Sequence, residues 1–218
     1  GLQFQHSYFE DDATFGNRNF TSAGLYGRGV FDNRDSDLDP TEGFYLEATI
    51  DPLYEFEYEN FLARATVEGR AYFAFDEDAN YILAARVRAG AVAGPSLTEI
   101  PPDLLFFAGG GGSVRGYAYR SIGVDDGLGN ITGGRYLLEA SVEGRVRFND
   151  QFGAVAFVDG GYVAADTFPG LEQLRLGAGV GIRYYTALGP LRLDVAVPLN
   201  KSPGDPDYAL YVGIGQSF

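Results

Sequence analysis

The residues most suited to chemistry lie in the stretch from Phe106 to Gly123, FFAGGGGSVRGYAYRSIG. A phosphate-binding P-loop needs G-x-x-x-x-G-K-[ST], and no lysine follows these glycines. A dinucleotide-binding turn needs a helix after its glycines, and no helical pattern follows here. We therefore interpret the run as a hinge that turns sharply and approaches other backbone closely, formed by Gly109, Gly110, Gly111 and Gly112.

Other catalytic and metal-binding chemistries are poorly supported. The chain has no cysteine and one histidine, His6, which disfavours a zinc site and a Ser-His-Asp triad. The acidic segment 32–43 fails as a calcium loop because Pro40 and Leu46 stand where Gly and Glu are required. It is better interpreted as a turn, with an adventitious cation as the alternative.

Glu139 and Glu143 would lie about 13 Å apart along a strand, too far for a glycosidase pair. We predict no catalytic residue, metal or cofactor.

One acidic residue stands out in an otherwise apolar segment. Asp159 is the only acid in the run 154–163. A lone carboxylate in such a run needs a partner. Arg115 is the obvious cation if its loop folds inward, and an arginine fork can hold two carboxylates, so Glu143 on the adjacent strand could share it. The alternative is an ordinary acid facing water.

Apolar and polar residues alternate with period two along most of the chain, which indicates strands. Many of the runs are longer than a mean strand of about 5–6 residues. Such long alternation without helical segments favours an all-β, antiparallel barrel of about ten strands. The runs are 2–10, 20–32, 43–51, 54–75, 80–93, 133–148, 152–165, 172–186, 190–199 and 208–218.

The pattern favours a transmembrane barrel over a soluble one. One face is almost entirely aliphatic with Tyr or Phe near the run ends, while the other carries Arg, Glu and Gly. Short and long connections alternate along the chain. Transmembrane barrels show the same alternation, with short turns on the periplasmic side and longer loops outside. We predict a single barrel domain over 1–218 in contact with the lipid bilayer. The long connection 95–132 is apolar at 104–107, so we expect it to fold into the lumen. The net charge of −14 disfavours nucleic acid.

The motifs together resemble the outer-membrane assembly and two-partner-secretion superfamily. The loop motif runs from Phe107-Ala-Gly-Gly to its tip, Val114-Arg115-Gly116-Tyr117. The acidic turn 32–43, the strand around Asp159, the strand after Pro190 and the terminal Phe218 follow in the family's order. The resemblance covers essentially the whole chain, and the loop looks most like the TamA type, with the BamA type next nearest.

The resemblance implies a barrel of about 16 strands preceded by POTRA domains, of which this chain would lack the POTRA domains and about six strands. It is then either the C-terminal part of a larger barrel or a small barrel closed on itself. In the family, the Arg of the loop motif tucks against luminal acids, here Glu143 and Asp159. The first and last strands form a seam that engages client strands, and the C-terminal strand signal would comprise Tyr208, Gly213 and Phe218.

The implied function is insertion and assembly of outer-membrane proteins by strand templating at the seam, without covalent chemistry. The implied location is the bacterial outer membrane. The implied partners are client outer-membrane β-barrel proteins and, through upstream domains, a periplasm-spanning partner. Two alternatives stay open. One is a two-partner-secretion or passive pore, and the other is a truncated or engineered barrel without activity of its own.

Overall fold

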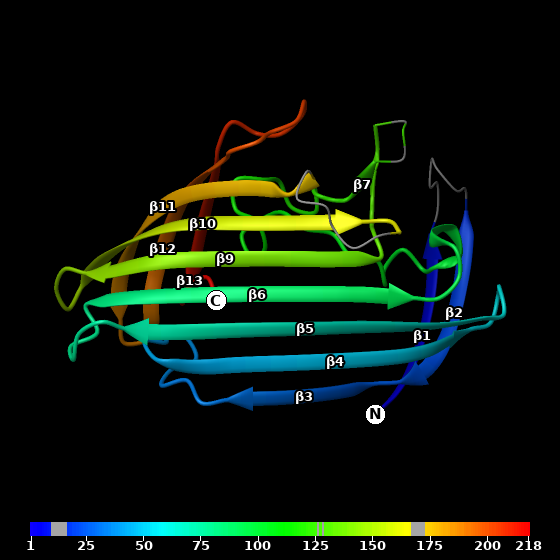
Figure 1. Ribbon diagram of the computed structural model, residues 1–218, viewed down its shortest axis with the longest axis horizontal. Helices are drawn as coiled ribbons and strands as arrows, with labels where there is room; N and C mark the ends of the chain where they lie inside the picture. The colour runs from blue at the N-terminus through cyan, green and yellow to red at the C-terminus, as the bar shows by residue number, and fades with distance from the viewer. Residues whose placement is uncertain (10–16, 126, 128, 167–172) are drawn as a thin grey trace.

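The computed structural model describes residues 1–9, 17–125, 127, 129–166 and 173–218. Within these ranges the chain is all-β, with one short 3-10 turn, and no helix there is long and apolar enough to cross a membrane. Eleven strands form one antiparallel sheet and two more form a small hairpin (Figure 1). The elements are β1 Leu2–Phe9, β2 Arg18–Leu25, β3 Gly27–Asp32, β4 Gly43–Glu55, β5 Asn60–Ala74, β6 Tyr81–Ala93, η1 Leu97–Glu99, β7 Val124–Asp125, β8 Ile131–Thr132, β9 Tyr136–Arg147, β10 Phe152–Ala164, β11 Arg175–Thr186, β12 Gly189–Pro198 and β13 Ala209–Ile214.

The large sheet follows chain order, β1-β2-β4-β5-β6-β9-β10-β11-β12-β13, with β3 also paired to β4. β2 and β3 occupy successive parts of one position beside β4, since Gly24 pairs with Leu53 and Gly27 with Ile50. The predicted run 20–32 covers both strands. Side chains on each strand alternate between two faces, so the parity of the sequence decides which residues meet.

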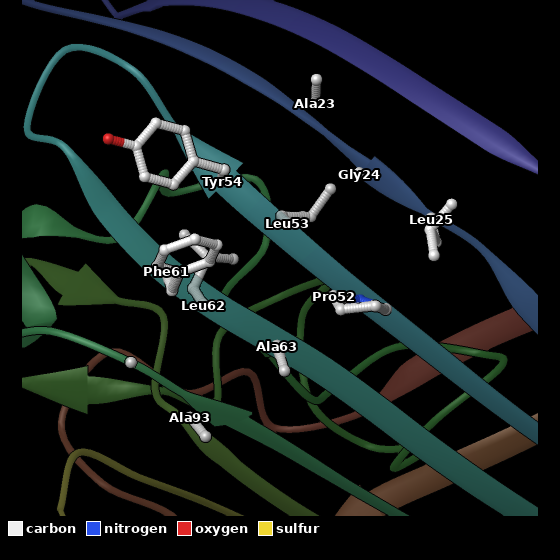
Figure 2. Close-up of a pocket in the computed structure, with 11 residues that line it drawn as sticks. Ala23, Gly24, Leu25, Pro52, Leu53, Tyr54, Phe61, Leu62, Ala63 and Ala93 are labelled. Atoms are coloured by element: carbon white, nitrogen blue, oxygen red, sulfur yellow. The ribbon is translucent and has the colours of Figure 1, made fainter.

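The predicted strand break near Pro52 is wrong. β4 continues through Pro52 to Glu55, and the turn lies at 56–59 instead. Proline has no N–H for a ladder bond, but Pro52 falls opposite the short gap between β2 and β3, where register pairs are interrupted. Figure 2 shows the apolar pocket at this junction, with Ala23 and Leu25 on β2 beside Pro52 on β4.

The two faces of the sheet reverse the usual order of a water-soluble protein. The convex face carries exposed aliphatic side chains such as Val180, Ile182 and Val212. The concave face carries buried charged side chains, among them Glu143 and Asp194. Charged groups are almost never fully buried unless they are paired, so this face requires an internal set of ion pairs.

The predicted small closed barrel is not observed. Among the described residues no register pair joins β1 to β13, so these strands are the two edges of a curled sheet (Figure 1). The outer edge of β3 likewise has no paired strand in the described ranges.

Connections differ between the two ends of the sheet. The turns 75–80, 148–151 and 187–188 lie at the end that also carries the C-terminus, which we call the tail end. The connections 94–135 and 199–208 lie at the opposite end, which we call the loop end. The long connection thus starts far from the C-terminus along the strand direction.

Candidate functional site

The connection 94–135, here called the long loop, packs against the concave face. Its bridges pair Phe106 with Gly134 and Ala108 with Ile122. Leu104 and Phe106 belong to an apolar cluster with residues of β4, β5, β6, β9 and β10. Burial of these side chains is favourable by about 1.5–3 kcal/mol for each large aliphatic or aromatic group. The apolar stretch that singled out this loop in the sequence is therefore its anchor to the sheet.

Only part of the glycine run needs glycine for its backbone conformation. Gly109 and Gly110 both have φ +102°, in the left-handed region that side chains disfavour. A Cβ at Gly109 would lie 2.6 Å from the Ala118 carbonyl oxygen. Gly111 is needed for space, because its Cβ would lie 2.8 Å from the Tyr211 ring. A Cβ added at Gly112 would meet no atom within 4 Å. The Gly112 carbonyl accepts a hydrogen bond from Arg86 Nη1 at 2.9 Å.

The loop tip places Arg115 between two carboxylates. Its Nε and Nη2 donate to the two oxygens of Asp159 at 2.7 and 2.9 Å. Its Nη1 donates to Glu143 Oε1 at 2.6 Å. The backbone N–H of Arg115 also donates to Asp159, at 3.0 Å. The guanidinium carbon lies 3.4 Å from the centre of the Phe157 ring, which adds a cation–π contact.

Arg115 and its two carboxylate partners are buried away from water, and neighbouring charges balance theirs. The side chains of Arg115, Glu143 and Asp159 are at most 1% exposed. Burial alone would lower the pKa of Arg115, but the hydrogen bonds with Asp159 and the charge of Glu143 raise it above its ordinary value. Arg115 therefore stays protonated. Breaking such a buried pair by removing one partner typically costs about 3–5 kcal/mol.

The ion pairs continue into neighbouring strands. Glu143 Oε2 accepts from Arg145 Nε at 2.9 Å, and Arg183 Nη1 donates to Asp194 Oδ1 at 2.5 Å. Asp194 Oδ2 lies 3.6 Å from Arg115 Nη1, which links the two pairs. Three arginines and three carboxylates thus form one buried set that we call the lumen network: Arg115, Arg145, Arg183, Glu143, Asp159 and Asp194.

The other tip residues fit the sheet closely. Val114 is fully buried, and a Cβ at Gly161 would lie 2.4 Å from its methyl group. Gly116 has φ +100° and donates its N–H to the Tyr211 hydroxyl at 3.0 Å. The Tyr117 hydroxyl is 2.9 Å from Asn200 Oδ1. Each tip residue therefore contacts the strands, and Tyr117 also contacts the 199–208 connection.

Glycines on the opposing strand make room for the tip. A Cβ on Gly177 of β11 would lie 1.9 Å from the Arg115 carbonyl oxygen. A Cβ on Gly179 would lie 2.4 Å from the Phe157 ring, and one on Gly181 would lie 1.9 Å from Asp194 Oδ1. The alternating glycines of β11 thus face the concave side, where they leave room for the loop tip and for the side chains of Phe157 and Asp194.

The three residues of the predicted C-terminal strand signal lie in different surroundings. Tyr208 is exposed and precedes β13, and Gly213 lies under Arg192, whose Nε would be 2.8 Å from a Cβ there. Phe218 differs from the alternation prediction, which places it on the convex face. It is 7% exposed on the concave side, because the chain turns at Gly215, where φ is +84°.

Three residues that contribute to these contacts, Asp194, Tyr211 and Asp39, have no distinctive signal in the sequence. Asp194 is one more inward residue of an alternating strand, and Tyr211 is one aromatic residue among 15 tyrosines. Asp39 looks like part of an acidic turn. Only the fold brings them to the lumen network, the loop tip and the C-terminal residues respectively.

The arrangement is suited to holding a loop rather than to covalent chemistry. The carboxylates of the lumen network are engaged by guanidinium groups, and Asp159 also accepts a backbone N–H. No group of three or more potential metal ligands occurs in the part of the chain that the structure describes.

Comparison with known proteins places these features in a family. The model of the Omp85 superfamily domain matches residues 3–218. The outer membrane protein assembly factor BamA of Nitratidesulfovibrio vulgaris (strain Hildenborough) is 30% identical over 127 residues, which are 56% of this chain and 16% of that protein. The crystal structure of BamA from Haemophilus ducreyi lacking POTRA domains 1-3 matches with a TM-score of 0.68 at 20% identity, over 89% of this chain and 42% of that one. The chain thus spans less than half the length of either relative.

Replacing Gly177 by alanine should weaken loop docking, because the added Cβ would overlap the Arg115 carbonyl. We expect a loss of about 1–3 kcal/mol in unfolding free energy, as for other overpacked sites. Urea unfolding of the refolded protein in detergent measures it. Gly144→Ala on β9 is the matched control, since no atom lies within 4 Å of its Cβ position. Equal losses in both variants would show that the space beside Gly177 is not limiting.

Proposed function

Because this chain belongs to the Omp85 superfamily, a family of integral outer-membrane proteins, we propose that it assembles other proteins into the bacterial outer membrane by pairing with their strands. The observation that carries the proposal is a curled sheet with an apolar convex face whose two sides, β13 on one and β1 with β3 on the other, lack a paired strand in the described ranges. Such an edge offers backbone N–H and C=O groups to an incoming strand.

The edge of β13 is the better defined of the two. Gly215 N donates to Pro190 O at 2.7 Å, so positions 213, 211 and 209 continue the hydrogen-bonded pairs with β12. The N–H groups of Leu210, Val212 and Ile214 then point away from β12. A client strand aligned beside β13 would bond to these groups without disturbing the existing ladder.

The lumen network serves this function by fixing the wall behind the edge. Arg115 ties the long loop to β9 and β10, and Tyr211 of β13 contacts the loop through Gly116. The loop therefore holds β13 against the middle of the sheet from the concave side. An ordered template lowers the entropy cost of pairing a disordered client strand.

The finer assignment is to the TamA type, on the strength of the tip motif with Tyr119 and the following Ser121-Ile122-Gly123. The relatives found by comparison are BamA proteins, so the assignment to the TamA type rests on these loop residues alone. Client outer-membrane barrels and the bilayer are the partners in this proposal. A periplasm-spanning partner would bind through upstream domains.

Val212→Pro tests strand templating. Proline removes an N–H that points to the free edge, and the Val212 side chain is 80% exposed, so the sheet should tolerate the change. We expect proteoliposomes with the wild-type protein to accelerate folding of a client barrel, and Val212→Pro to lose most of that acceleration. Val212→Ala keeps the N–H and should behave as wild type. If Val212→Pro folds normally and accelerates the client fully, templating at β13 is wrong.

A plugged pore is the second candidate function. The loop tip lies beside a polar cavity at the loop end, lined in part by Tyr117, Arg175 and Asn200. In a pore, Arg115→Ala should release the plug and produce steady conductance in planar bilayers. In an assembly factor, the same variant should slow client folding without a steady open channel. Conductance with unchanged client folding would favour the pore.

A further inference from the structure

The last four residues, 215–218, do not continue β13, and we call them the C-terminal tail. Gly215 makes the last ladder bond to Pro190 and has φ +84°. This left-handed conformation turns the chain onto the concave face. A residue with a side chain is strained there, so the turn depends on glycine.

The tail is held by the turn between β3 and β4, residues 33–42. Gln216 N donates to the Leu38 carbonyl at 2.8 Å. Gln216 Nε2 donates to Asp39 Oδ1 at 2.9 Å, and Arg147 Nη2 donates to Asp39 Oδ2 at 3.0 Å. The Asp39 carboxylate therefore joins the tail to β9, although 177 positions separate it from Gln216.

The end of the tail is buried in the same region. Phe218 packs against Tyr72, with ring centres 6.5 Å apart, and its carbonyl accepts from Arg145 Nη2 at 3.2 Å. Arg145 Nη1 also donates to the Pro40 carbonyl at 3.3 Å. Arg145 bonds Glu143 of the lumen network, so the tail and the loop tip share one set of contacts.

The β3–β4 turn is shaped to present Asp39. Asp35 accepts from the Thr41 and Glu42 N–H groups at 2.9 and 3.2 Å. Burial would raise the pKa of Asp35, but its bonds with Thr41 outweigh this and lower it. Arg34 forms a two-point contact with Asp32. The acidic residues that suggest a calcium loop in the sequence are thus used in protein contacts.

The same residues can adopt a second arrangement. The exposed residues Tyr208, Leu210, Val212 and Ile214 share one parity, and Gln216 and Phe218 continue it. An extended tail would lengthen β13 by four residues and bring Phe218 to the convex, apolar face. The Phe218 side chain suits both the buried concave position and the apolar convex face. Which arrangement the tail adopts therefore depends on its polar contacts.

We propose that Asp39 is a positioning residue that clamps the C-terminal tail inward and so limits the length of the β13 edge. The clamp is a property of the chain alone. Its consequence for clients, a shorter template while the clamp is closed, rests on the proposed function.

Carboxypeptidase A digestion tests the clamp, because this enzyme removes an accessible C-terminal phenylalanine. In detergent, wild-type protein should lose Phe218 slowly, and Asp39→Ala should lose it at least tenfold faster. Asp39→Asn keeps the acceptor for Gln216 but not the charge for Arg147, and should give an intermediate rate. Asp37→Ala is the matched control, since the Asp37 side chain is 88% exposed in the same turn. Mass spectrometry reads the loss, and heat-dependent gel mobility checks that each variant is folded.

Fast digestion of the wild-type protein would show that the tail is not clamped. Slow digestion of both wild type and Asp39→Ala would show that Asp39 does not hold it. Gly215→Ala should also accelerate digestion, because it disfavours the inward turn without touching Asp39. The client-folding assay is read separately. An unclamped tail with unchanged client folding would refute the claim that the tail limits the template and leave the clamp standing, while templating at β13 itself is tested by Val212→Pro.

Discussion

The structure depends on the burial of one guanidinium group. Arg115 lies at the tip of a long loop, at most 1% exposed, and such a charge is tolerated only when carboxylates surround it. Asp159 and Glu143 meet that need from adjacent strands, and glycines on β11 leave room for the tip backbone. The conformation of the loop, the register of β9 against β10 and the small side chains of β11 are all consequences of this constraint.

The lumen network also connects the two ends of the sheet. Glu143 binds Arg115 from the loop end through one oxygen and Arg145 through the other. Arg145 reaches the β3–β4 turn and the last residue of the chain. Loop docking and tail position therefore share two side chains. A disturbance at the tip reaches the C-terminal edge through contacts that are each close to hydrogen-bond length.

The sequence predicts local features well and closure poorly. Alternation places Asp159 and Glu143 on one face, and a lone acid in an apolar run calls for a cation. By contrast, the break predicted at Pro52 is wrong because only the gap between β2 and β3 makes proline harmless there. The inward turn of Phe218 depends on one backbone angle at Gly215 and on a distant turn. Periodicity carries no information about either.

The central claim is that Arg115 and Glu143 stabilise the loop as a directly coupled pair. A double-mutant cycle with Arg115→Ala, Glu143→Ala and the double variant measures this coupling from unfolding free energies in lipid. We expect a coupling energy of at least about 1.5 kcal/mol, because Arg115 Nη1 and Glu143 Oε1 lie 2.6 Å apart in a buried contact that either single variant removes. A coupling energy near zero would contradict the account, because the two side chains would then contribute independently.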